Sequence, residues 1–337
     1  MKAAVFKALG QPLAVESVDN PRPAPNEVIV KVGRCGICGS DLHMTEDPVF
    51  SVESGTVLGH EYAGEVVELG SAVRGLKAGD RITVSPLRGC GECSSCLAGQ
   101  PAWCSGMRLQ SGGYAEYSAV AERQCVKLPS YVTLEDGALA EPLAVALHGV
   151  VQAGMSPGAR VLVLGAGPIG LGTAFWARRL GAGHVVVSDL EGWQESRAYE
   201  MGATAFFPKT EALVDEVNRT MGGPPDIVFE CVGRPGVIAQ AIDHVRTRGT
   251  VVVLGLCTLP DTFVPFTAVS KEVRIQMSAF FAFKEFCTAI DTLEADQVKP
   301  HALITNTVTL KDMPVVFEDL RRRTTQCKVL VDPVAGD

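Results

Sequence analysis

The chain has 337 residues, of which 47% are hydrophobic and 20% charged, an ordinary globular composition that is sufficient for two domains with their own cores. Its 30 basic and 38 acidic residues give a net charge of −8, which argues against nucleic acid or an anionic membrane as a partner. The N-terminal stretch has no signal-peptide pattern, and no apolar run reaches the roughly 20 residues of a membrane-spanning helix, so we expect a cytoplasmic protein.

The first part of the chain is rich in Gly, Pro and short β-type runs. Residues 27–38, 62–70 and 80–86 have the composition of strands bounded by turn residues. This texture predicts a small β-rich domain, which we place at residues 1–142.

Four cysteines stand close together in a polar, Gly-rich loop at residues 88–105. Their spacing is C-x2-C-x2-C-x7-C, formed by Cys90, Cys93, Cys96 and Cys104. A reducing cytosol disfavours disulfides, and the chain's eleven cysteines cannot all pair with one another. Four thiolates suit tetrahedral zinc with every coordination position filled. An iron–sulfur cluster also takes four thiolates, and we rank it below zinc. The loop therefore predicts a structural zinc.

Strand-like and helical patterns alternate in the second part of the chain. Apolar runs of strand length recur, with helix-like stretches between them, at residues 159–165, 184–190, 226–233 and 249–256. Such alternation predicts a parallel sheet covered by helices, and we assign it to residues 143–278. Residues 279–337 return to a mixed texture and end in a strand-like run.

A glycine pattern marks a nucleotide site in this second domain. Gly165, Gly167 and Gly170 have G-x-G-x-x-G spacing between a predicted strand and a predicted helix, and Asp189 ends the next predicted strand. The glycines allow a tight turn and close approach of a pyrophosphate, and the acidic side chain suits the ribose hydroxyls of NAD. The predicted cofactor residues are Gly165, Gly167, Pro168, Ile169, Gly170 and Asp189. As alternatives, Asp189 caps the following helix, or a more distant Arg197 accommodates NADP.

Three further segments of the sequence contain candidate ligands for a second metal ion. Cys38, His60 and Glu61 lie on Gly-flanked segments of the first domain, and Glu141 lies at its junction with the second. Each has an ordinary explanation, as a buried thiol, a core histidine or a helix start. Their combination with a dinucleotide-binding domain favours zinc chemistry.

The motifs together resemble those of a known family. The stretches CGICGSDLH, GHEYAGEVVELG, GDRITVSP, GGYAEY, EPLAVALHGV and GAGPIG, with the four-cysteine loop, resemble zinc-dependent medium-chain alcohol dehydrogenases of the polyol and secondary-alcohol branch. The resemblance implies an α/β protein with a GroES-like β-rich catalytic domain and a Rossmann domain, the first completed by residues 279–337. It also implies NAD, two zinc ions per chain, a small-molecule alcohol or ketone as substrate, and a homodimer or homotetramer.

The resemblance also implies roles for individual residues. Cys38 and His60 match ligands of the catalytic zinc, the third ligand being Glu141 or Glu61. Asp41 matches a residue that orients the histidine, and Ser40 and His43 match a proton relay to solvent. The expected reaction transfers a hydride from a secondary alcohol to NAD and leaves a ketone.

Three apolar residues bear on the substrate. Met44, Phe280 and Phe281 occupy positions where sorbitol-type relatives carry hydrogen-bonding side chains. A buried sugar hydroxyl without a partner costs about 1–3 kcal/mol, so we expect an apolar or cyclic secondary alcohol. The alternatives are a polyol or 2,3-diol substrate, with the phenylalanines serving only in packing, and a non-catalytic zinc protein of the same fold.

Overall fold

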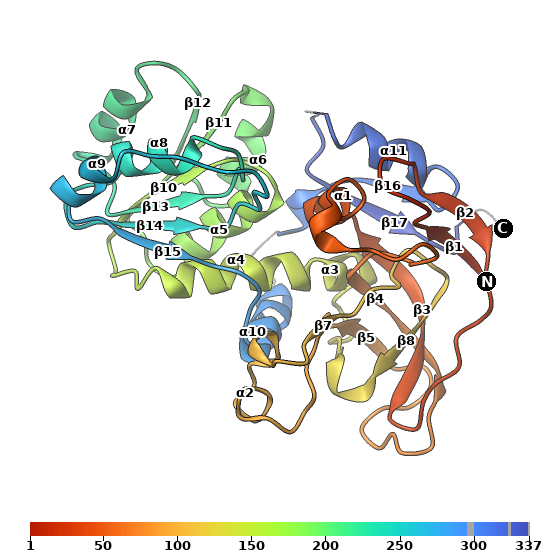
Figure 1. Ribbon diagram of the computed structural model, residues 1–337. Coiled ribbons are helices and arrows are strands. Elements are labelled where there is room, and N and C mark those ends of the chain that lie inside the picture. The colour runs from red at the N-terminus through yellow and green to blue at the C-terminus, as the bar shows by residue number, and fades with distance from the viewer. Residues whose placement is uncertain (295–299, 323–324, 336–337) are drawn as a thin grey trace. The chain divides into compact units, whose positions relative to one another are not determined.

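The computed structural model describes residues 1–294, 300–322 and 325–335. The chain forms two compact units (Figure 1), one made of residues 1–141 and 282–337 and the other of residues 142–281. The sequence predicts that the first domain is interrupted after residue 142 and that the second domain ends at residue 278. In the structure, the first unit is interrupted after residue 141 and the second unit ends at residue 281. The first unit is therefore discontinuous, because its last segment returns after the second unit is complete.

The first unit is built around a mixed sheet with strand order β16-β17-β3-β4-β5-β9, in which β8 also pairs with β3. Short strands β1 with β2 and β6 with β7 form two small antiparallel ladders. The strands of this unit are β1 (Lys2–Val5), β2 (Ala14–Ser17), β3 (Glu27–Gly36), β4 (Glu61–Leu69), β5 (Arg81–Val84), β6 (Leu87–Arg88), β7 (Arg108–Leu109), β8 (Tyr117–Ala121), β9 (Cys125–Lys127), β16 (Ile304–Thr309) and β17 (Lys328–Asp332). The strands predicted at residues 27–38, 62–70 and 80–86 are thus present.

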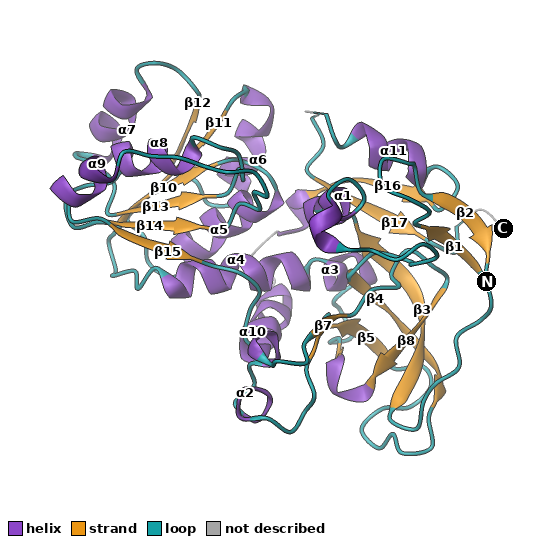
Figure 2. Cartoon of the chain, viewed as in Figure 1, coloured by secondary structure: helices purple, strands orange, loops and turns teal. Residues whose placement is uncertain are grey.

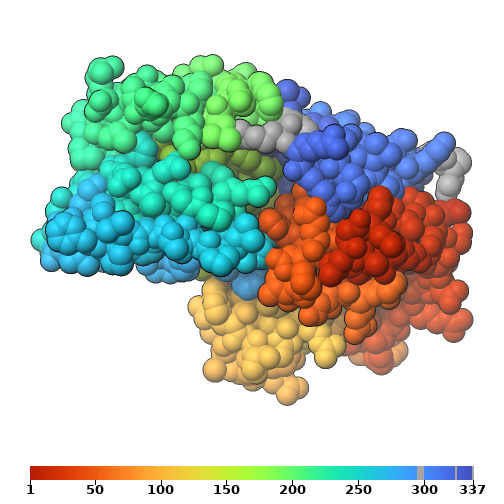
Figure 3. All heavy atoms as spheres, turned by 45° about the horizontal axis from the view of Figure 1, so that its top comes forward, coloured from red at the N-terminus to blue at the C-terminus, as the bar shows by residue number. Residues whose placement is uncertain are grey.

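The C-terminal segment enters the sheet beside the N-terminal strands. Strand β17 pairs antiparallel with β3, where Leu330 lies opposite Gly36, and β3 pairs antiparallel with β4, where Gly36 lies opposite Glu61. In Figure 3 the blue C-terminal atoms lie against the red and orange N-terminal ones. This register brings the first residues of β17 and β4 to the same end of β3.

The second unit is a parallel sheet with helices on both faces (Figure 2). Its strand order β12-β11-β10-β13-β14-β15 corresponds to 3-2-1-4-5-6 in chain order, the arrangement of dinucleotide-binding sheets. The strands are β10 (Arg160–Leu164), β11 (His184–Asp189), β12 (Ala205–Pro208), β13 (Ile227–Glu230), β14 (Thr250–Val253) and β15 (Arg274–Met277). The central strands are almost fully buried, as expected when helices cover both faces.

Helices connect and cover these sheets. In the first unit they are α1 (Gly39–Met44), α2 (Ser94–Leu97), α3 (Leu134–Ala138), α10 (Phe283–Glu294) and α11 (Met313–Asp319), and α4 (Ala140–Gln152) begins there and continues into the second unit. In the second unit they are α5 (Pro168–Arg179), α6 (Glu195–Glu200), α7 (Leu213–Met221), α8 (Val237–His244) and α9 (Pro265–Ser270). Among the described residues, every helix is too short or too polar to cross a bilayer.

Candidate active site and metal centres

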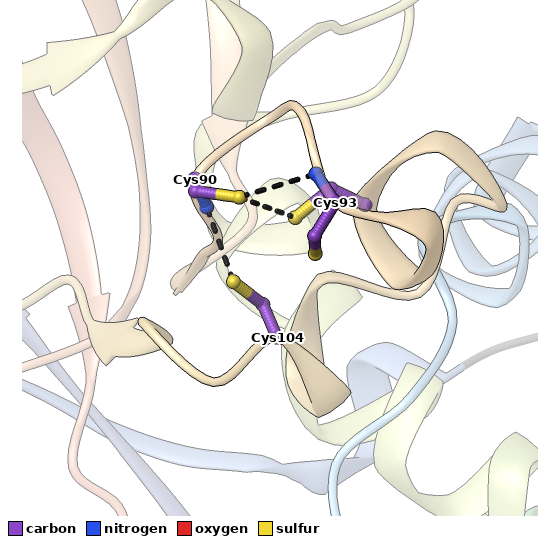
Figure 4. A group of neighbouring side chains, drawn as sticks. Cys90, Cys93 and Cys104 are labelled. Atoms are coloured by element: carbon purple, nitrogen blue, oxygen red, sulfur yellow. Dashed lines mark hydrogen bonds between the residues drawn. The ribbon is translucent and has the colours of Figure 1, made fainter.

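The four predicted loop cysteines converge. The sulfurs of Cys90, Cys93, Cys96 and Cys104 all lie within 4.8 Å of one another, and those of Cys90 and Cys96 are 3.9 Å apart. Figure 4 shows Cys90, Cys93 and Cys104 of this group. A tetrahedron of thiolates at a Zn–S distance of about 2.3 Å has sulfurs separated by about 3.8 Å. The donor set and its spacing therefore fit a zinc ion with no open coordination position.

Backbone amides of the loop favour the thiolate form of Cys90 and Cys104, whereas burial and the neighbouring cysteines raise the pKa of Cys96 to about 11. The N–H groups of Glu92 and Cys93 both donate to the Cys90 sulfur at 3.4 Å and lower the pKa of Cys90 to about 6. The amides of Cys90 and Gly106 donate to Cys104 at 3.3 Å and lower its pKa as well. Thiolates are the form that binds zinc, so the loop is arranged for a metal.

Hydrogen bonds from Arg123 and Phe283 help to tie the loop to the rest of the first unit. The Arg123 guanidinium donates to the backbone carbonyls of Gly89 and Cys90. The Phe283 amide, at the start of α10, donates to the carbonyl of Gly99 at 2.8 Å. The loop thus connects its own domain to the returning C-terminal segment, which is consistent with a bracing role.

A second group of donors lies at the ends of β3 and β4. One donor atom from each of Cys38, His60 and Glu61 falls within a 4.8 Å group. Cys38 precedes α1 in extended conformation, His60 immediately precedes β4, and Glu61 is the first residue of β4. Thiolate, imidazole and carboxylate are a ligand set typical of catalytic zinc, which keeps a fourth position for substrate.

Asp41 and Tyr114 support the histidine. Asp41 is fully buried, and its carboxylate lies 3.3 Å from His60 Nδ1, which leaves Nε2 for a metal. The Tyr114 hydroxyl donates to the other Asp41 oxygen at 2.5 Å. Burial lowers the pKa of His60, but Asp41 and Cys38 raise it well above its usual range. The same negative surroundings favour a metal cation at this place.

Glycine at position 59 allows this arrangement. Its φ is +84°, and a Cβ there would lie 2.6 Å from the Tyr114 ring. A side chain would displace the tyrosine that supports Asp41. This explains why the GHE stretch carries glycine immediately before His60.

Glu61 is held by a lysine from the C-terminal segment. Lys328 Nζ donates to both Glu61 carboxylate oxygens, at 2.7 and 2.6 Å, and to the Ile37 carbonyl at 3.0 Å. A Cβ at Gly36 would lie 2.1 Å from a Glu61 oxygen, so glycine is needed to leave room for the carboxylate. The pairing of β17, β3 and β4 therefore determines where Glu61 points.

Glu141 lies near this group but outside it. Its side chain is in the first turn of α4 and is 8% exposed. Burial, together with the Glu61 and Asp41 carboxylates, raises the pKa of Glu141 to about 7 against the opposing effect of His60 and Lys328. Of the two glutamates expected to compete for the third ligand position, the structure brings Glu61, and not Glu141, within 4.8 Å of the Cys38 and His60 donors.

The two residues expected to carry the proton both lie on α1. The Ser40 hydroxyl donates to the Cys38 sulfur at 3.2 Å. Within the part of the chain that the structure describes, no hydrogen bond joins Ser40 to His43.

The predicted glycines form the expected turn between β10 and α5. Gly165 has φ +100°, which favours glycine, and a Cβ at Gly170 would lie 1.8 Å from the Gly165 carbonyl oxygen. Among the described residues, a Cβ at Gly167 would meet no atom within 4 Å, so the backbone is open to a ligand there. Gly167 caps α5 and Pro168 occupies its first turn, followed by Ile169. This is the geometry of a pyrophosphate cradle at a helix N-terminus.

Asp189 ends β11 at the same edge of the sheet. One carboxylate oxygen accepts a hydrogen bond from the Ala166 amide at 2.8 Å, and the other accepts from the Leu190 amide at 2.6 Å. These two hydrogen bonds hold the side chain beside the glycine turn. Its position suits a ribose hydroxyl.

The three residues expected to line an apolar pocket differ in exposure. Phe281 is 0% exposed. Phe280 is 40% exposed and has a left-handed backbone with φ 59°. Met44 is partly buried against the core of the first unit.

Sequence reasoning missed two residues of the metal centre. Tyr114 lies within the GGYAEY stretch and Lys328 within a strand-like run, and neither pattern assigns them a role. A lysine at the start of an otherwise apolar strand is a signal for a buried charge pair, since lysine is rarely buried without a partner. Its partner, however, depends on strand register.

Comparisons with known proteins agree with this geometry. Residues 24–130 match the alcohol dehydrogenase GroES-like domain, and residues 168–295 match the zinc-binding dehydrogenase domain. D-xylulose reductase A of Aspergillus niger is 35% identical over 324 residues, covering 91% of this chain and 90% of the relative.

Solved structures agree as well. A zinc-binding dehydrogenase of Sinorhizobium meliloti 1021 bound to NADP is 34% identical with a TM-score of 0.89, covering 98% of this chain and 99% of that one. The 2R,3R-butanediol dehydrogenase of Bacillus subtilis is 30% identical with a TM-score of 0.88, at the same coverage.

Proposed function

Because this chain belongs to the zinc-dependent medium-chain alcohol dehydrogenases, we propose that it oxidises a secondary alcohol to a ketone with NAD, at a metal centre formed by Cys38, His60 and Glu61. The carbinol carbon transfers a hydride to NAD⁺ and the hydroxyl loses a proton, giving ketone, NADH and H⁺. The single observation that carries the proposal is the convergence of these three donors within 4.8 Å.

The family assignment confirms the broader predictions. The chain has the α/β fold with GroES-like and Rossmann domains, and it is an alcohol dehydrogenase acting on CH–OH groups with zinc and a nicotinamide dinucleotide. The metal ligands, the cofactor preference and the substrate class are finer properties, and individual residues of this chain set each of them.

Cys38, His60 and Glu61 would hold the catalytic zinc. A zinc ion held there supplies Lewis acidity that stabilises negative charge on the substrate oxygen. Asp41 holds the imidazole of His60 in place, and Tyr114 holds Asp41. Ser40 and His43, which both lie on α1, would pass the substrate proton toward solvent.

NAD rather than NADP is the proposed cofactor. The Asp189 carboxylate is fixed beside the glycine turn, where it accepts hydrogen bonds from ribose hydroxyls and repels a 2′-phosphate. Structural relatives include one bound to NADP and one, from Escherichia coli CFT073 at 26% identity, complexed with NADH. The ratio of kcat/KM for NAD and NADP tests this preference.

An apolar or cyclic secondary alcohol is the proposed substrate class. Met44 and the exposed part of Phe280 offer no hydrogen bond to a substrate hydroxyl. Phe281, the third residue of this group, is fully buried.

A polyol or 2,3-diol is the second candidate, and the relatives favour it. The similar proteins include a D-xylulose reductase and a butanediol dehydrogenase. Further hydroxyls on such substrates would need partners other than Met44 and Phe280.

An alcohol panel separates the candidates. NADH formation is followed by absorbance with matched polyols, vicinal diols, and aliphatic and cyclic secondary alcohols. Higher kcat/KM for the apolar alcohols supports the first class, whereas efficient polyol oxidation assigns the second. No turnover of any of them, with one zinc per chain confined to the cysteine loop, would leave a non-catalytic zinc protein.

A cytoplasmic homodimer or homotetramer completes the proposal. Strand β15 lies at one edge of the parallel sheet, and nearby Val264, Phe266 and Val269 are exposed. An open strand edge next to exposed apolar side chains suits pairing with a second copy. Light scattering of the purified protein measures the oligomeric state.

A further inference from the structure

Lys328 is a buried cation whose hydrogen-bonding capacity is fully used. Its side chain is 2% exposed, and its ammonium group donates to Glu61 Oε1, Glu61 Oε2 and the Ile37 carbonyl at 2.7, 2.6 and 3.0 Å. An ammonium group has three protons to donate, and each has an acceptor here. Glu61 is 1% exposed, so water does not compensate its charge.

The surroundings of Lys328 are those of the metal centre. Two of the three acceptors of its ammonium group are the oxygens of Glu61, which belongs to the donor group with Cys38 and His60. The lysine therefore stands beside the same anionic groups that would bind a metal cation. A bound metal and the ammonium group share Glu61 and repel each other.

This sharing has a thermodynamic consequence. Without metal, Lys328 is the cation that compensates the buried Glu61 carboxylate, and removing it leaves that charge unpaired. With metal, Glu61 has a second positive partner. Lys328 therefore contributes more to the stability of the metal-free form than to that of the metal-loaded form. By linkage, a group that stabilises the metal-free form more strongly weakens metal binding.

We propose that Lys328 is a positioning residue that holds the Glu61 carboxylate at the centre before metal enters and that limits how tightly the centre retains its metal. The inference rests on the proposed assignment of Cys38, His60 and Glu61 as the catalytic metal site. It adds to that assignment a residue that touches neither substrate nor cofactor.

The test measures zinc retention and thermal stability in Lys328→Met. A competing chelator is titrated into the zinc-loaded enzyme, and the release of zinc is followed. The phase of zinc release that is absent in Cys38→Ala is assigned to the centre formed by Cys38, His60 and Glu61. We expect Lys328→Met to retain zinc at this centre roughly tenfold more tightly, the scale typical of residues next to a metal's ligands. The variant's melting temperature should fall more in the metal-free than in the zinc-loaded form. Lys328→Arg, which keeps the charge, should restore retention toward the wild-type value.

A surface lysine provides the matched control. Lys127 pairs with Asp80 at 2.9 Å with its side chain 53% exposed. Lys127→Met should leave zinc retention unchanged and should affect the metal-free and zinc-loaded forms equally. Lys328→Gln, whose amide still donates a hydrogen bond, carries the same expectation as Lys328→Met.

Results other than those expected for the Lys328 variants would overturn the proposal. Weaker or unchanged zinc retention would show that Lys328 only supports the fold around Glu61. Failure of both neutral variants to fold even with zinc would do the same, because the metal-loaded form is expected to tolerate them. If Cys38→Ala still binds two zinc ions per chain, it is the metal-site assignment that fails instead.

Discussion

The two candidate metal-binding groups of this protein differ in where their donors come from. The four cysteines of the loop lie between residues 90 and 104, and backbone amides of the same loop donate to their sulfurs. The other group draws on the ends of β3 and β4 and is supported by Tyr114 and Lys328 from distant parts of the chain. The first is a local structure with a uniform donor set, and the second depends on the tertiary fold.

This difference separates stability from reactivity. A closed site of four thiolates leaves no position for a substrate, so its effect is on the fold. A mixed site of three protein donors keeps a position open, and its supporting side chains orient the ligands. Substitutions in the two groups should therefore change different properties.

Replacing Cys38 should have the largest effect on activity. Cys38→Ala removes one of the three donors, so kcat/KM should fall by more than roughly 100-fold, beyond the loss typical of supporting residues. Zinc content measured by mass spectrometry should drop from two to one per chain, with little change in melting temperature. A variant that kept full activity would show that the reaction does not depend on this centre.

Replacing Cys93 should mainly reduce stability. Cys93→Ala opens the four-sulfur site, and loss of a structural metal should lower the free energy of unfolding by more than about 3 kcal/mol. Urea denaturation measures the change. The folded fraction at low temperature should keep kcat/KM near the wild-type value. Loss of activity without loss of stability would contradict the separation of roles.

Replacing Asp41 should weaken the mixed site without removing a donor. In Asp41→Asn the charge beside His60 is lost, so zinc affinity and kcat/KM should each fall roughly 10- to 100-fold. Zinc competition and steady-state kinetics measure the two quantities. An effect confined to stability would assign Asp41 a packing role only.

Replacing Tyr114 should give the smallest of these effects. Tyr114→Phe removes the hydroxyl that donates to Asp41, and kcat/KM should fall about tenfold, at the lower end of the same range. Tyr62 is the control, because its hydroxyl pairs with Ser118 at 3.0 Å. Tyr62→Phe should lower the free energy of unfolding by about 1 kcal/mol and leave kcat/KM unchanged. Equal activity losses in both variants would indicate a general packing effect.

Local patterns in the sequence were sufficient for several of these features. Predicted strands are present at β3, β4, β5, β10 and β11, and the glycine turn before α5 has the expected geometry. Apolar runs and turn residues determine the structure of only a few neighbouring positions, so their effect can be predicted without knowledge of the fold. The convergence of the four cysteines follows from their short spacing for the same reason.

Features that depend on contacts between residues far apart in the sequence could not be predicted from the sequence. The different exposure of the neighbouring Phe280 and Phe281 is one example, since Phe280 is 40% exposed and Phe281 is completely buried. Exposure of an apolar ring depends on what packs around it, and a single sequence does not contain that information.

The sequence by itself determined the element types, the four-cysteine zinc loop, the nucleotide turn and the identity of the candidate metal donors. Only the tertiary structure decided that Glu61 rather than Glu141 joins Cys38 and His60, and that Lys328 holds it. Glu61 and Lys328 are 267 residues apart in sequence and meet because β17 and β4 both pair with β3. Strand register, which is set by the packing of the whole sheet, determines such contacts.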